Sequence, residues 1–352
     1  MKLGVNLFYW GLGLTGEQQL AIVREAERLG YDSVWAAEAY GSDAATVLAW
    51  LAGQTERIKV GSAIFQIPAR TPAMTAMTAA TLDQLSGGRF KLGLGPSGPQ
   101  VSEGWHGVRF ARQLQRMREY VEVVRMALSR QRVEYHGSTI ELPLPDGEGR
   151  PLKLTIGPVQ ERIPILLAAI GPKAVALTGE IADGWLPAFF SPEHADAMLE
   201  PLRVGAERAG RSPDEIEVCP TVNVFVTDDI EAARDKMRPL LALYVGGMGS
   251  RDTNFYARLV ASFGFEDAAR RVQDLYLDGH REEAAAALPD ALIDAVSLIG
   301  PADVIRERLA LFQAAGIGTL ILSAVTFEAE QRMEQLRLVA ELAEQAAVGS
   351  PG

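Results

Sequence analysis

Short apolar runs alternate with amphipathic segments along the whole chain. Eight of these runs are rich in Val, Ile, Leu and Phe and are bounded by glycine, proline or polar residues, which is the pattern of buried strands. They lie at residues 3–7, 33–36, 58–64, 90–95, 165–169, 184–187, 217–226 and 319–324. Each run is followed by a segment with the i, i+3, i+4 apolar spacing of a helix. The chain therefore predicts eight consecutive β–α units.

The predicted helices carry start and stop signals. Thr15 and Gln18 form a capping-box pattern before the first helix, and Thr71 with Pro72 supplies a cap and a proline at the first helical position after the third strand. In four units a glycine stands where the chain returns from helix to strand, and there it can adopt the left-handed conformation that closes a helix. These glycines are Gly30, Gly87, Gly184 and Gly316. A glycine at the same place in four units indicates that one structural unit repeats along the chain.

Nearly all-apolar strands that alternate with helices favour a parallel sheet covered by helices. An open doubly wound sheet would also fit, but eight consecutive units match an α/β protein of the (β/α)8 TIM-barrel class better. The chain is longer than such a barrel needs, so we expect insertions after strands four and seven and a hairpin before strand five. These segments are residues 96–109, residues 246–300, which are largely helical, and residues 136–164, where 138–142 would pair with 152–156. We expect residues 1–352 to form one domain.

Composition narrows the class of protein. The 352 residues are 48% hydrophobic and 22% charged, which suits a globular chain and not a disordered one. The formal net charge of -11 disfavours binding to nucleic acid or anionic lipid, since phosphates are held by clustered Lys and Arg. Cys219 is the only cysteine, so we expect neither a disulfide within the chain nor a cysteine-based zinc site. No apolar run is long enough to span a membrane and no signal-peptide pattern precedes the first strand, so we expect a cytoplasmic protein.

Familiar catalytic motifs are missing from the sequence. It has no G-x-S-x-G, G-x-x-x-x-G-K-[ST] or H-E-x-x-H pattern, and its four histidines lie far apart, so a nucleophilic hydrolase, a P-loop enzyme and a metal site are not expected. The G-x-G-x-x-G run that ends at Gly98 is a weak dinucleotide signal, because Pro96 and Pro99 break the helix start that such a motif needs. An aldolase would need a lysine or a metal-binding carboxylate cluster at a strand end, and neither Lys59 nor Lys91 stands at one.

In a barrel, function gathers on the loops after the carboxyl ends of the strands. The most informative of these exits is Ala168-Ala169-Ile170-Gly171, where Pro172 begins a helix at once. The free backbone N–H groups of that helix start would face the barrel mouth and would suit a phosphate of a cofactor. A plain tight turn between strand and helix is the alternative interpretation.

Five short segments form a specific pattern when they are taken together, although none of them is specific alone. They are Ser62 to Pro72 (SAIFQIPARTP), Thr81 to Gly95 (TLDQLSGGRFKLGLG), Gly104 to Gly107 (GWHG), Ala169 to Pro172 (AIGP) and Ala182 to Trp185 (ADGW). Together they resemble the luciferase-like flavin and deazaflavin oxidoreductases, over nearly the whole chain. The resemblance implies a (β/α)8 barrel that holds coenzyme F420, or alternatively FMN, with its ring over the end of the third strand. It also implies a non-proline cis peptide there, at Ser62–Ala63 or Ala63–Ile64.

The resemblance also carries over individual residues. Those that match the family's cofactor-binding segments are Glu38, Ser62, Ala63, Ile64, Ala168, Ala169, Ile170 and Gly171. Glu38 would approach the ring or the ribityl hydroxyls, or else form a structural salt bridge. Asp43 opens the next helix and is expected to cap it.

The candidates for proton transfer follow from a departure from the family. Deazaflavin dehydrogenases of sugars and alcohols carry a histidine after the acidic residue of strand two, where this chain has Ala39. That difference disfavours oxidation of an alcohol or a glucose phosphate. It leaves Glu103 and His106, on the loop after strand four, together with Glu38 as the catalytic candidates. Three tryptophans are candidates to stack on the ring or line the pocket, the last being better suited to packing the barrel: Trp10, Trp105 and Trp185.

The sequence favours an oxidoreductase that transfers a hydride between coenzyme F420 and a small organic substrate, such as an unsaturated or imine-like acceptor, or that catalyses the reverse oxidation. A monooxygenase that uses reduced FMN is the alternative, and a barrel that binds a flavin without catalysis is a further one. The amphipathic segment 328–346 and the apolar outer helices indicate a homodimer, as in similar proteins.

Overall fold

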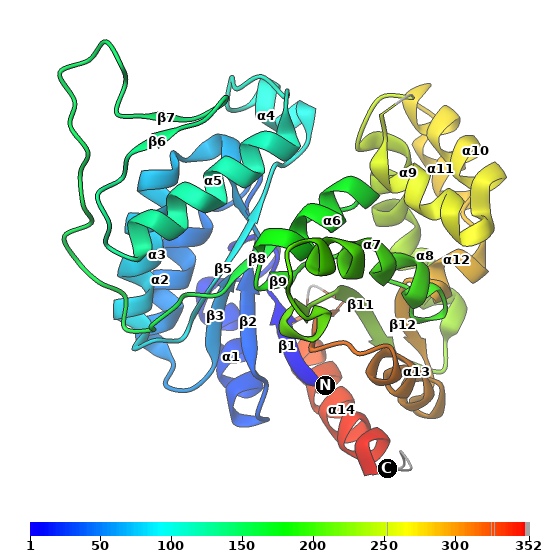
Figure 1. Ribbon diagram of the computed structural model, residues 1–352. Coiled ribbons are helices and arrows are strands. Elements are labelled where there is room, and N and C mark those ends of the chain that lie inside the picture. Colours follow the sequence, from blue (N-terminus) through cyan, green and yellow to red (C-terminus); the bar gives the residue numbers. More distant parts are fainter. Residues whose placement is uncertain (252, 325, 327, 349–352) are drawn as a thin grey trace.

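The computed structural model describes residues 1–251, 253–324, 326 and 328–348. At its centre lies a curled sheet of parallel strands, and helices cover the outside of this sheet (Figure 1). The strands that follow one another in the sheet are β10 (Glu217–Val218), β9 (Gly184–Trp185), β8 (Ile165–Leu167), β5 (Phe90–Gly95), β3 (Lys59–Ser62), β2 (Ser33–Ala36), β1 (Lys2–Asn6), β13 (Thr319–Ala324), β11 (Thr221–Val226) and β12 (Ser297–Gly300). All eight predicted runs form strands, so the α/β class and the parallel sheet are confirmed.

The strands differ from the prediction in three places. The run 58–64 ends early, and a short strand β4 (Phe65–Gln66) follows it and pairs with β5. The run 217–226 divides at Cys219–Pro220 into β10, which pairs with β9, and β11, which pairs with β13 and β12. A proline has no N–H for a continuous ladder, which explains the division. β12 was not predicted, because its four residues end a segment dominated by helical spacing.

Two groups of helices surround the sheet. Those that cover it are α1 (Gly16–Arg28), α2 (Ala44–Gln54), α3 (Pro72–Ser86), α5 (Gln113–Leu128), α6 (Pro172–Ile181), α7 (Ala195–Arg208), α13 (Ala302–Ala314) and α14 (Ala329–Val348), and they enclose the main hydrophobic core. The second group contains most of the insertion expected at residues 246–300 but begins earlier, with α8; it has a hydrophobic cluster of its own and lies to one side of the sheet (Figure 1). It comprises α8 (Ile230–Ala242), the π-helix Leu243–Gly247, α9 (Phe255–Val260), the π-helix Ala261–Phe265, α10 (Glu266–Leu277), α11 (Arg281–Ala286) and α12 (Asp290–Ala295).

The predicted helix signals are confirmed with one exception. The Thr15 hydroxyl accepts a hydrogen bond from the backbone N–H of Gln18, and the side-chain oxygen of Gln18 accepts one from the backbone N–H of Thr15, which completes the capping box of α1. Thr71 accepts a hydrogen bond from the first turn of α3 in the same way. Three of the four return glycines have positive φ, of 82°, 63° and 77° in chain order. Gly184 does not close a helix: it lies inside β9, where the neighbouring strands leave no room for a Cβ. Single 3-10 turns lie at Ile67–Ala69, Pro192–His194 and Pro213–Glu215.

The segment before strand five forms a hairpin, but its partners differ from the predicted ones. β6 (Tyr135–His136) pairs with β7 (Glu141–Leu142) in antiparallel fashion. The turn lies at residues 138–140, inside the stretch predicted to be a strand. The reason is Glu119 of α5, whose buried carboxylate accepts hydrogen bonds from the three backbone N–H groups of this turn. A side chain distant in the sequence therefore sets the register of the hairpin.

Replacing Glu119 by glutamine is expected to destabilise the protein in a pH-dependent way. Burial raises the pKa of this carboxyl, but hydrogen bonds from Thr139, Gln115 and Ser138 outweigh burial and lower the pKa from 4.5 to about 2. A carboxyl with a lowered pKa stabilises the fold above its ordinary pKa and loses this contribution as the pH falls toward the lowered value. We therefore expect Glu119→Gln to cost about 2 kcal/mol at pH 7 and clearly less at pH 3. Urea unfolding at both pH values measures this, and equal losses would contradict the expectation.

Candidate active site

The interior of the curled sheet is filled by a layer of large side chains. Its buried members are Trp35, Leu166, Leu186, Cys219 and Ile321. Ala63, Ile64 and Ala168 pack on this layer but stay partly exposed. They follow the carboxyl ends of β3 and β8, the end of the strands at which α/β barrels carry their active sites. We call this open end, formed by the residues that follow β1, β2, β3, β5, β8 and β9, the mouth.

Small residues leave a shelf at the mouth. The peptide bond between Ala63 and Ile64 is cis, at one of the two positions predicted from the sequence. Beside it, a Cβ on Gly95 would lie 2.6 Å from Cδ1 of Ile64 and 3.3 Å from Cβ of Ala168. Any larger residue at position 95 would therefore fill the space above the shelf. We call Ala63, Ile64, Gly95 and Ala168 the cradle, and its shape fits one face of a flat ring.

Two polar side chains border the cradle. The hydroxyl of Ser62 is buried and exchanges hydrogen bonds with the backbone of Gly93, so it fastens β3 to β5. Gln66 pairs with Gly95 in the sheet and donates from Nε2 to the carbonyl oxygen of Ala39 at 3.0 Å. The Oε1 of Gln66 is buried and has no hydrogen-bond partner within the described part of the chain. Because buried polar atoms are rarely left unpaired, this oxygen fits a ligand that brings its own N–H donor.

Glu38 forms a salt bridge, which was one of its two predicted roles. Its side chain is 7% exposed and accepts hydrogen bonds from Arg70 and from the backbone N–H groups of Ala44 and Gln66. Arg70 also pairs with Asp43, which caps α2 as expected. Both carboxylate oxygens of Glu38 are therefore occupied, and they hold the segment after β3 against the start of α2.

The exit of β8 holds the predicted phosphate-binding segment. Ala169 is buried, and its carbonyl oxygen accepts a hydrogen bond of 2.9 Å from Nε1 of Trp185, which packs inside the sheet as expected. Ile170 and Gly171 are partly exposed, and Gly171 caps α6 without a side-chain hydrogen bond. The first turn of α6 offers fewer free N–H groups than expected. Pro172 has no backbone N–H, and the backbone N–H groups of Ala174 and Val175 donate to the carbonyl oxygen of Gly171.

The loop after β5 carries the other two catalytic candidates. It begins with the short helix α4 (Pro99–Gly104). Glu103 is exposed and accepts a hydrogen bond of 2.9 Å from the backbone N–H of Phe110, which closes the loop on itself. His106 is half-buried, and its Nε2 is buried without a hydrogen-bond partner among the described residues. Trp105 between them is 66% exposed. Of the two candidates, His106 is the one that keeps a free proton-transfer atom.

Aromatic side chains that the sequence did not single out form the other side of the mouth. They are Tyr9, Tyr40, Phe189, Tyr244 and Tyr256. The ring centroids of the last three lie 4.9 to 5.5 Å apart. The first three stand at strand exits, a signal by which they could have been found. Tyr244 and Tyr256 belong to the helical insertion, where no pattern in the sequence marks them. Trp10, in contrast, packs on Trp50 of α2 at 5.1 Å.

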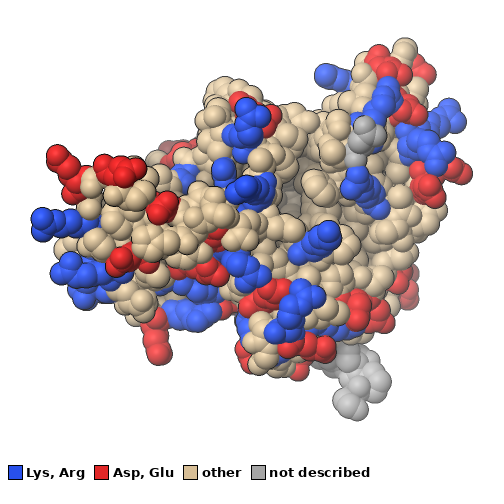
Figure 2. Space-filling model, turned by 45° about the horizontal axis from the view of Figure 1, so that its top comes forward, with Lys and Arg blue, Asp and Glu red and all other residues tan. Residues whose placement is uncertain are grey.

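The mouth is visible as a hollow in the molecular surface. Figure 2 shows the hollow between the part of the molecule that carries α4 and the helical insertion. Most of the atoms in its walls belong to uncharged residues, whereas Lys and Arg side chains stand around its rim. The hollow therefore favours a ligand whose buried part is uncharged.

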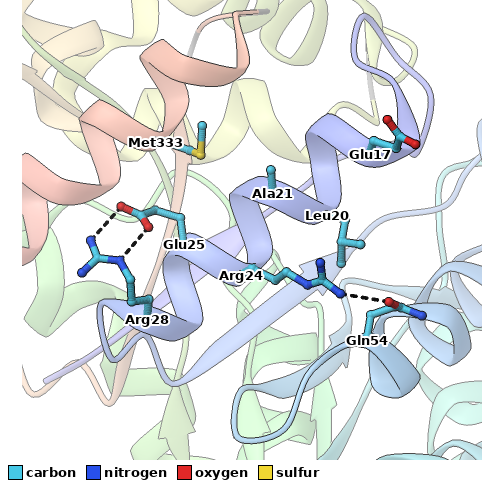
Figure 3. A pocket seen from close by; sticks show the side chains of 8 residues that line it. All are labelled: Glu17, Leu20, Ala21, Arg24, Glu25, Arg28, Gln54 and Met333. Atoms are coloured by element: carbon cyan, nitrogen blue, oxygen red, sulfur yellow. Dashed lines mark hydrogen bonds and ion pairs between the residues drawn. The ribbon is translucent and has the colours of Figure 1, made fainter.

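Another hollow lies on the outside of the sheet, between α1, α2 and α14 (Figure 3). Its volume is about 640 Å³. Four of its polar groups pair with one another, since Arg28 contacts Glu25 at 2.8 Å and Arg24 contacts Gln54 at 3.0 Å. Because this hollow lies on the outside of the sheet, away from the strand ends, and both of its arginines are paired, it is not the candidate active site.

The lysines of the strands lie at the opposite end of the sheet from the mouth. Lys91 pairs with Glu217 at 2.7 Å, and Lys59 pairs with Asp32 at the same distance. This agrees with the expectation that neither lysine serves as a catalytic amine. Within the described residues no group of His, Cys, Asp and Glu has the arrangement of a metal site. None of the described helices has the length and hydrophobicity needed to cross a bilayer.

Comparisons with known proteins agree with this geometry. Residues 6–319 match the model of the luciferase-like monooxygenase family. A Mycobacterium tuberculosis protein, provisionally named a coenzyme F420-dependent oxidoreductase, is 44% identical over 335 residues, which are 93% of this chain and 96% of that protein. The solved structure of the F420-dependent tetrahydromethanopterin reductase of Methanopyrus kandleri has a TM-score of 0.81 with 23% identity and covers 98% of both chains. The oxygenating constituent of 3,6-diketocamphane monooxygenase of Pseudomonas putida, in complex with FMN, has a TM-score of 0.69 with 22% identity and also covers 98% of both chains. The chain therefore belongs to the luciferase-like monooxygenase family.

Proposed function

We propose that this protein is an F420-dependent oxidoreductase that transfers a hydride between the deazaflavin coenzyme and a small organic substrate. The observation that carries the proposal is the cradle, in which Ala63, Ile64 and Ala168 stay partly exposed on the buried layer inside the sheet and Gly95 carries no side chain beside them. A shelf of this kind suits a flat tricyclic ring. The 44% identity to a relative provisionally named for F420 supports this coenzyme over FMN.

The positions of the residues support the following roles in this proposal. The cradle would support one face of the ring, residues 168–171 would hold the phosphate-bearing chain, and Gln66 would offer its unpaired Oε1 to an N–H of the ring. When bound, the coenzyme supplies the hydride chemistry. The protein orients the two reactants and excludes water. His106 is our candidate for proton transfer, because its Nε2 is free, and Glu38 is a positioning residue that holds the segment beside the cradle.

A titration of the purified protein with F420 and with FMN tests the proposal, with absorbance and fluorescence followed in the oxidised and reduced forms. We expect F420 to bind with a dissociation constant in the micromolar range or below, and FMN to bind at least about tenfold more weakly. A preference for reduced FMN, together with oxygen consumption, would identify a monooxygenase instead. Tight binding of F420 without turnover of any acceptor would identify a non-catalytic binding protein, and binding of neither cofactor would refute the assignment of the cradle.

Three further expectations are part of the proposal. We propose that β10 and β11, joined through Cys219–Pro220, close the sheet into a (β/α)8 barrel, since β10 pairs with β9 and β11 with β13.

We propose that residues 1–352 form one domain and that two chains form a homodimer. Exposed apolar side chains on α2 and α3 support the dimer: Trp50, Met74, Met77 and Leu85. Light scattering of the purified protein is expected to give twice the mass of the chain, and the mass of one chain would contradict the dimer.

A further inference from the structure

Four polar side chains stand at neighbouring positions on four consecutive strands of the sheet, β1, β13, β11 and β12. We call them the polar row: Asn6, Ser323, Asn223 and Ser297. Asn223 pairs with Ser323 on one side and with Ser297 on the other, and Asn6 follows the residue of β1 that pairs with the residue before Ser323. Paired residues of neighbouring strands lie about 4.8 Å apart and project from the same face of a sheet. Backbone pairing therefore brings the four side chains together.

The polar row lies on the inner face of the curled sheet. A Cβ on Gly4 would lie 3.1 Å from Nε1 of Trp35 and 3.4 Å from Cγ1 of Ile321, two members of the buried layer inside the sheet. Asn6 stands two residues after Gly4, and Ser323 stands two residues after Ile321, so both point to this inner side. Ile321 belongs to the same packed cluster as three of the cradle residues. The row is therefore a neighbour of the cradle.

The members of the row lack hydrogen-bond partners. Ser297 and Ser323 are 0% and 1% exposed, and neither hydroxyl oxygen has a partner among the described residues. The amide of Asn223 forms no hydrogen bond within the described part of the chain, and in Asn6 only Oδ1 is used, to accept from the backbone N–H of Phe8. Buried polar groups are nearly always paired with protein, water or a ligand. The row is therefore suited to a molecule that brings its own donors and acceptors.

Two members of the row can be reached from the mouth. Asn6 and Asn223 stay partly exposed although they point into the sheet, and the ion pairs of the strand lysines occupy the other end of the interior. The next inward-facing residues along β11 and β12 are Phe225 and Ile299, which pack on the hydrophobic cluster of the helical insertion. The row is therefore a polar strip between apolar surfaces, where hydrogen bonds are stronger than in water.

We propose that the polar row binds the substrate, and that the group it binds is an uncharged amide with its N–H and C=O side by side, as in an unsaturated lactam. The inference rests on the proposed function, because it places this substrate beside a coenzyme in the cradle. The carboxamide of Asn223 has a carbonyl oxygen and an NH₂ group, so it can accept from the N–H and donate to the C=O of one ligand. A hydroxyl both donates and accepts, so the two serines can pair with the positions that the amides leave free.

Other classes of substrate use less of the row. A ketone has no N–H for the carbonyl oxygen of Asn223, and a hydrocarbon leaves every member of the row unpaired. A site built to hydrogen-bond an N–H or O–H discriminates against analogues that lack it. Lys and Arg side chains stand around the rim of the hollow (Figure 2), whereas the row itself carries no charge. A phosphate or carboxylate of either reactant is therefore expected at the rim, and the amide on the row.

The test uses the full chain loaded with oxidised F420, which has no hydride to give, so that binding is measured without turnover. Four ligands with a six-membered ring are titrated: the lactam 5,6-dihydropyridin-2-one, cyclohex-2-enone, cyclohexene and cyclohex-1-ene-1-carboxylate. Saturation-transfer NMR gives their dissociation constants. We expect the lactam to bind about tenfold more tightly than any of the other three.

Variants of the row locate this binding. Asn223→Leu keeps the size of the side chain but removes its hydrogen bonds, so it should weaken lactam binding about tenfold and leave cyclohexene binding unchanged. Ser297→Ala and Ser323→Ala should each weaken lactam binding about threefold and raise the melting temperature of the free protein, because each removes a buried hydroxyl without a partner. The matched control is Ser129→Ala, whose exposed hydroxyl donates to the carbonyl oxygen of Met126 at the end of α5. It should change neither lactam binding nor F420 affinity and should not raise the melting temperature.

The outcomes separate this inference from the proposed function. A lactam that binds no more tightly than the enone or the carboxylate, or unchanged lactam binding in all three variants of the row, would overturn the inference. F420 affinity is measured in the same variants, because the coenzyme ring carries amide groups of its own; a loss there would assign the row to the coenzyme and would also overturn it. The ligand series on the parent decides the matter even if a variant does not fold. If F420 binds the parent but the lactam is not preferred, only the substrate class is wrong, and if F420 does not bind the parent, the proposed function itself fails.

Discussion

Gly95→Val is expected to fold and to bind coenzyme F420 at least about 100-fold more weakly than the parent protein, a loss of about 2.7 kcal/mol. The first added carbon alone would lie 2.6 Å from Cδ1 of Ile64 and 3.3 Å from Cβ of Ala168. Cδ1 is the end of a flexible side chain, so it can move where backbone could not. The strand then keeps its position, while the added groups fill the space above the cradle. Fluorescence titration with F420 measures the loss.

The stability of this variant must be measured beside its affinity. Crowding an already packed site costs about 1–3 kcal/mol, so we expect a lower melting temperature with an unchanged circular dichroism spectrum. Gly53→Ala is the control: it also replaces a glycine by a residue with a Cβ, but nothing lies within 4 Å of the new atom. It should leave F420 affinity unchanged and should stabilise α2 by about 0.5–1 kcal/mol. A folded Gly95→Val protein with parental affinity would remove the cradle from the binding site.

Glu38→Ala is expected to destabilise the protein by about 3–5 kcal/mol, because it breaks a buried ion pair and leaves one partner behind. The side chains of Glu38 and Arg70 are only 7% and 14% exposed. Arg70 would keep Asp43 as its partner, while the backbone N–H groups of Ala44 and Gln66 would lose their acceptor. Since Gln66 borders the cradle, F420 affinity should fall as well. Urea unfolding at neutral pH gives the first quantity and the cofactor titration gives the second.

An exposed ion pair provides the control for this experiment. Glu266 pairs with Arg270 at 3.2 Å, and both side chains are largely exposed. Exposed pairs of this kind contribute about 0.5 kcal/mol or less, so Glu266→Ala should be close to neutral. Glu38→Gln separates positioning from catalysis. If Glu38 only positions the segment, this variant loses stability and affinity together; a variant of normal stability and affinity without turnover would make Glu38 a catalytic residue.

The strands and helix caps were predicted from the sequence because they depend on neighbours along the chain. Strand periodicity, the capping box at Thr15 and the cap at Thr71 are each set within a few residues, and all were found in the structure. The hairpin shows the limit of such arguments. Its strands were placed from apolar residues alone, but Glu119, distant in sequence, decides where the chain turns. β12 was missed for the same reason, since only its pairing with β11 makes it a strand.

The same distinction, between features set by neighbours along the chain and features set by distant residues, applies to the candidate site. The sequence by itself determined the family, eight of the runs that form strands, and the cis peptide at one of two neighbouring bonds. These depend on local patterns and on a motif read along the chain. That the site lies at the carboxyl end of the sheet stays a prediction. Only the tertiary structure decided that Glu38 is paired with Arg70, that Ser62 is used by the backbone of β5, and that Tyr244 packs on Phe189 of the loop after β9. Those contacts join residues from separate loops, and they exist only because the curling of the sheet and the packing of the inserted helices bring the loops to one place.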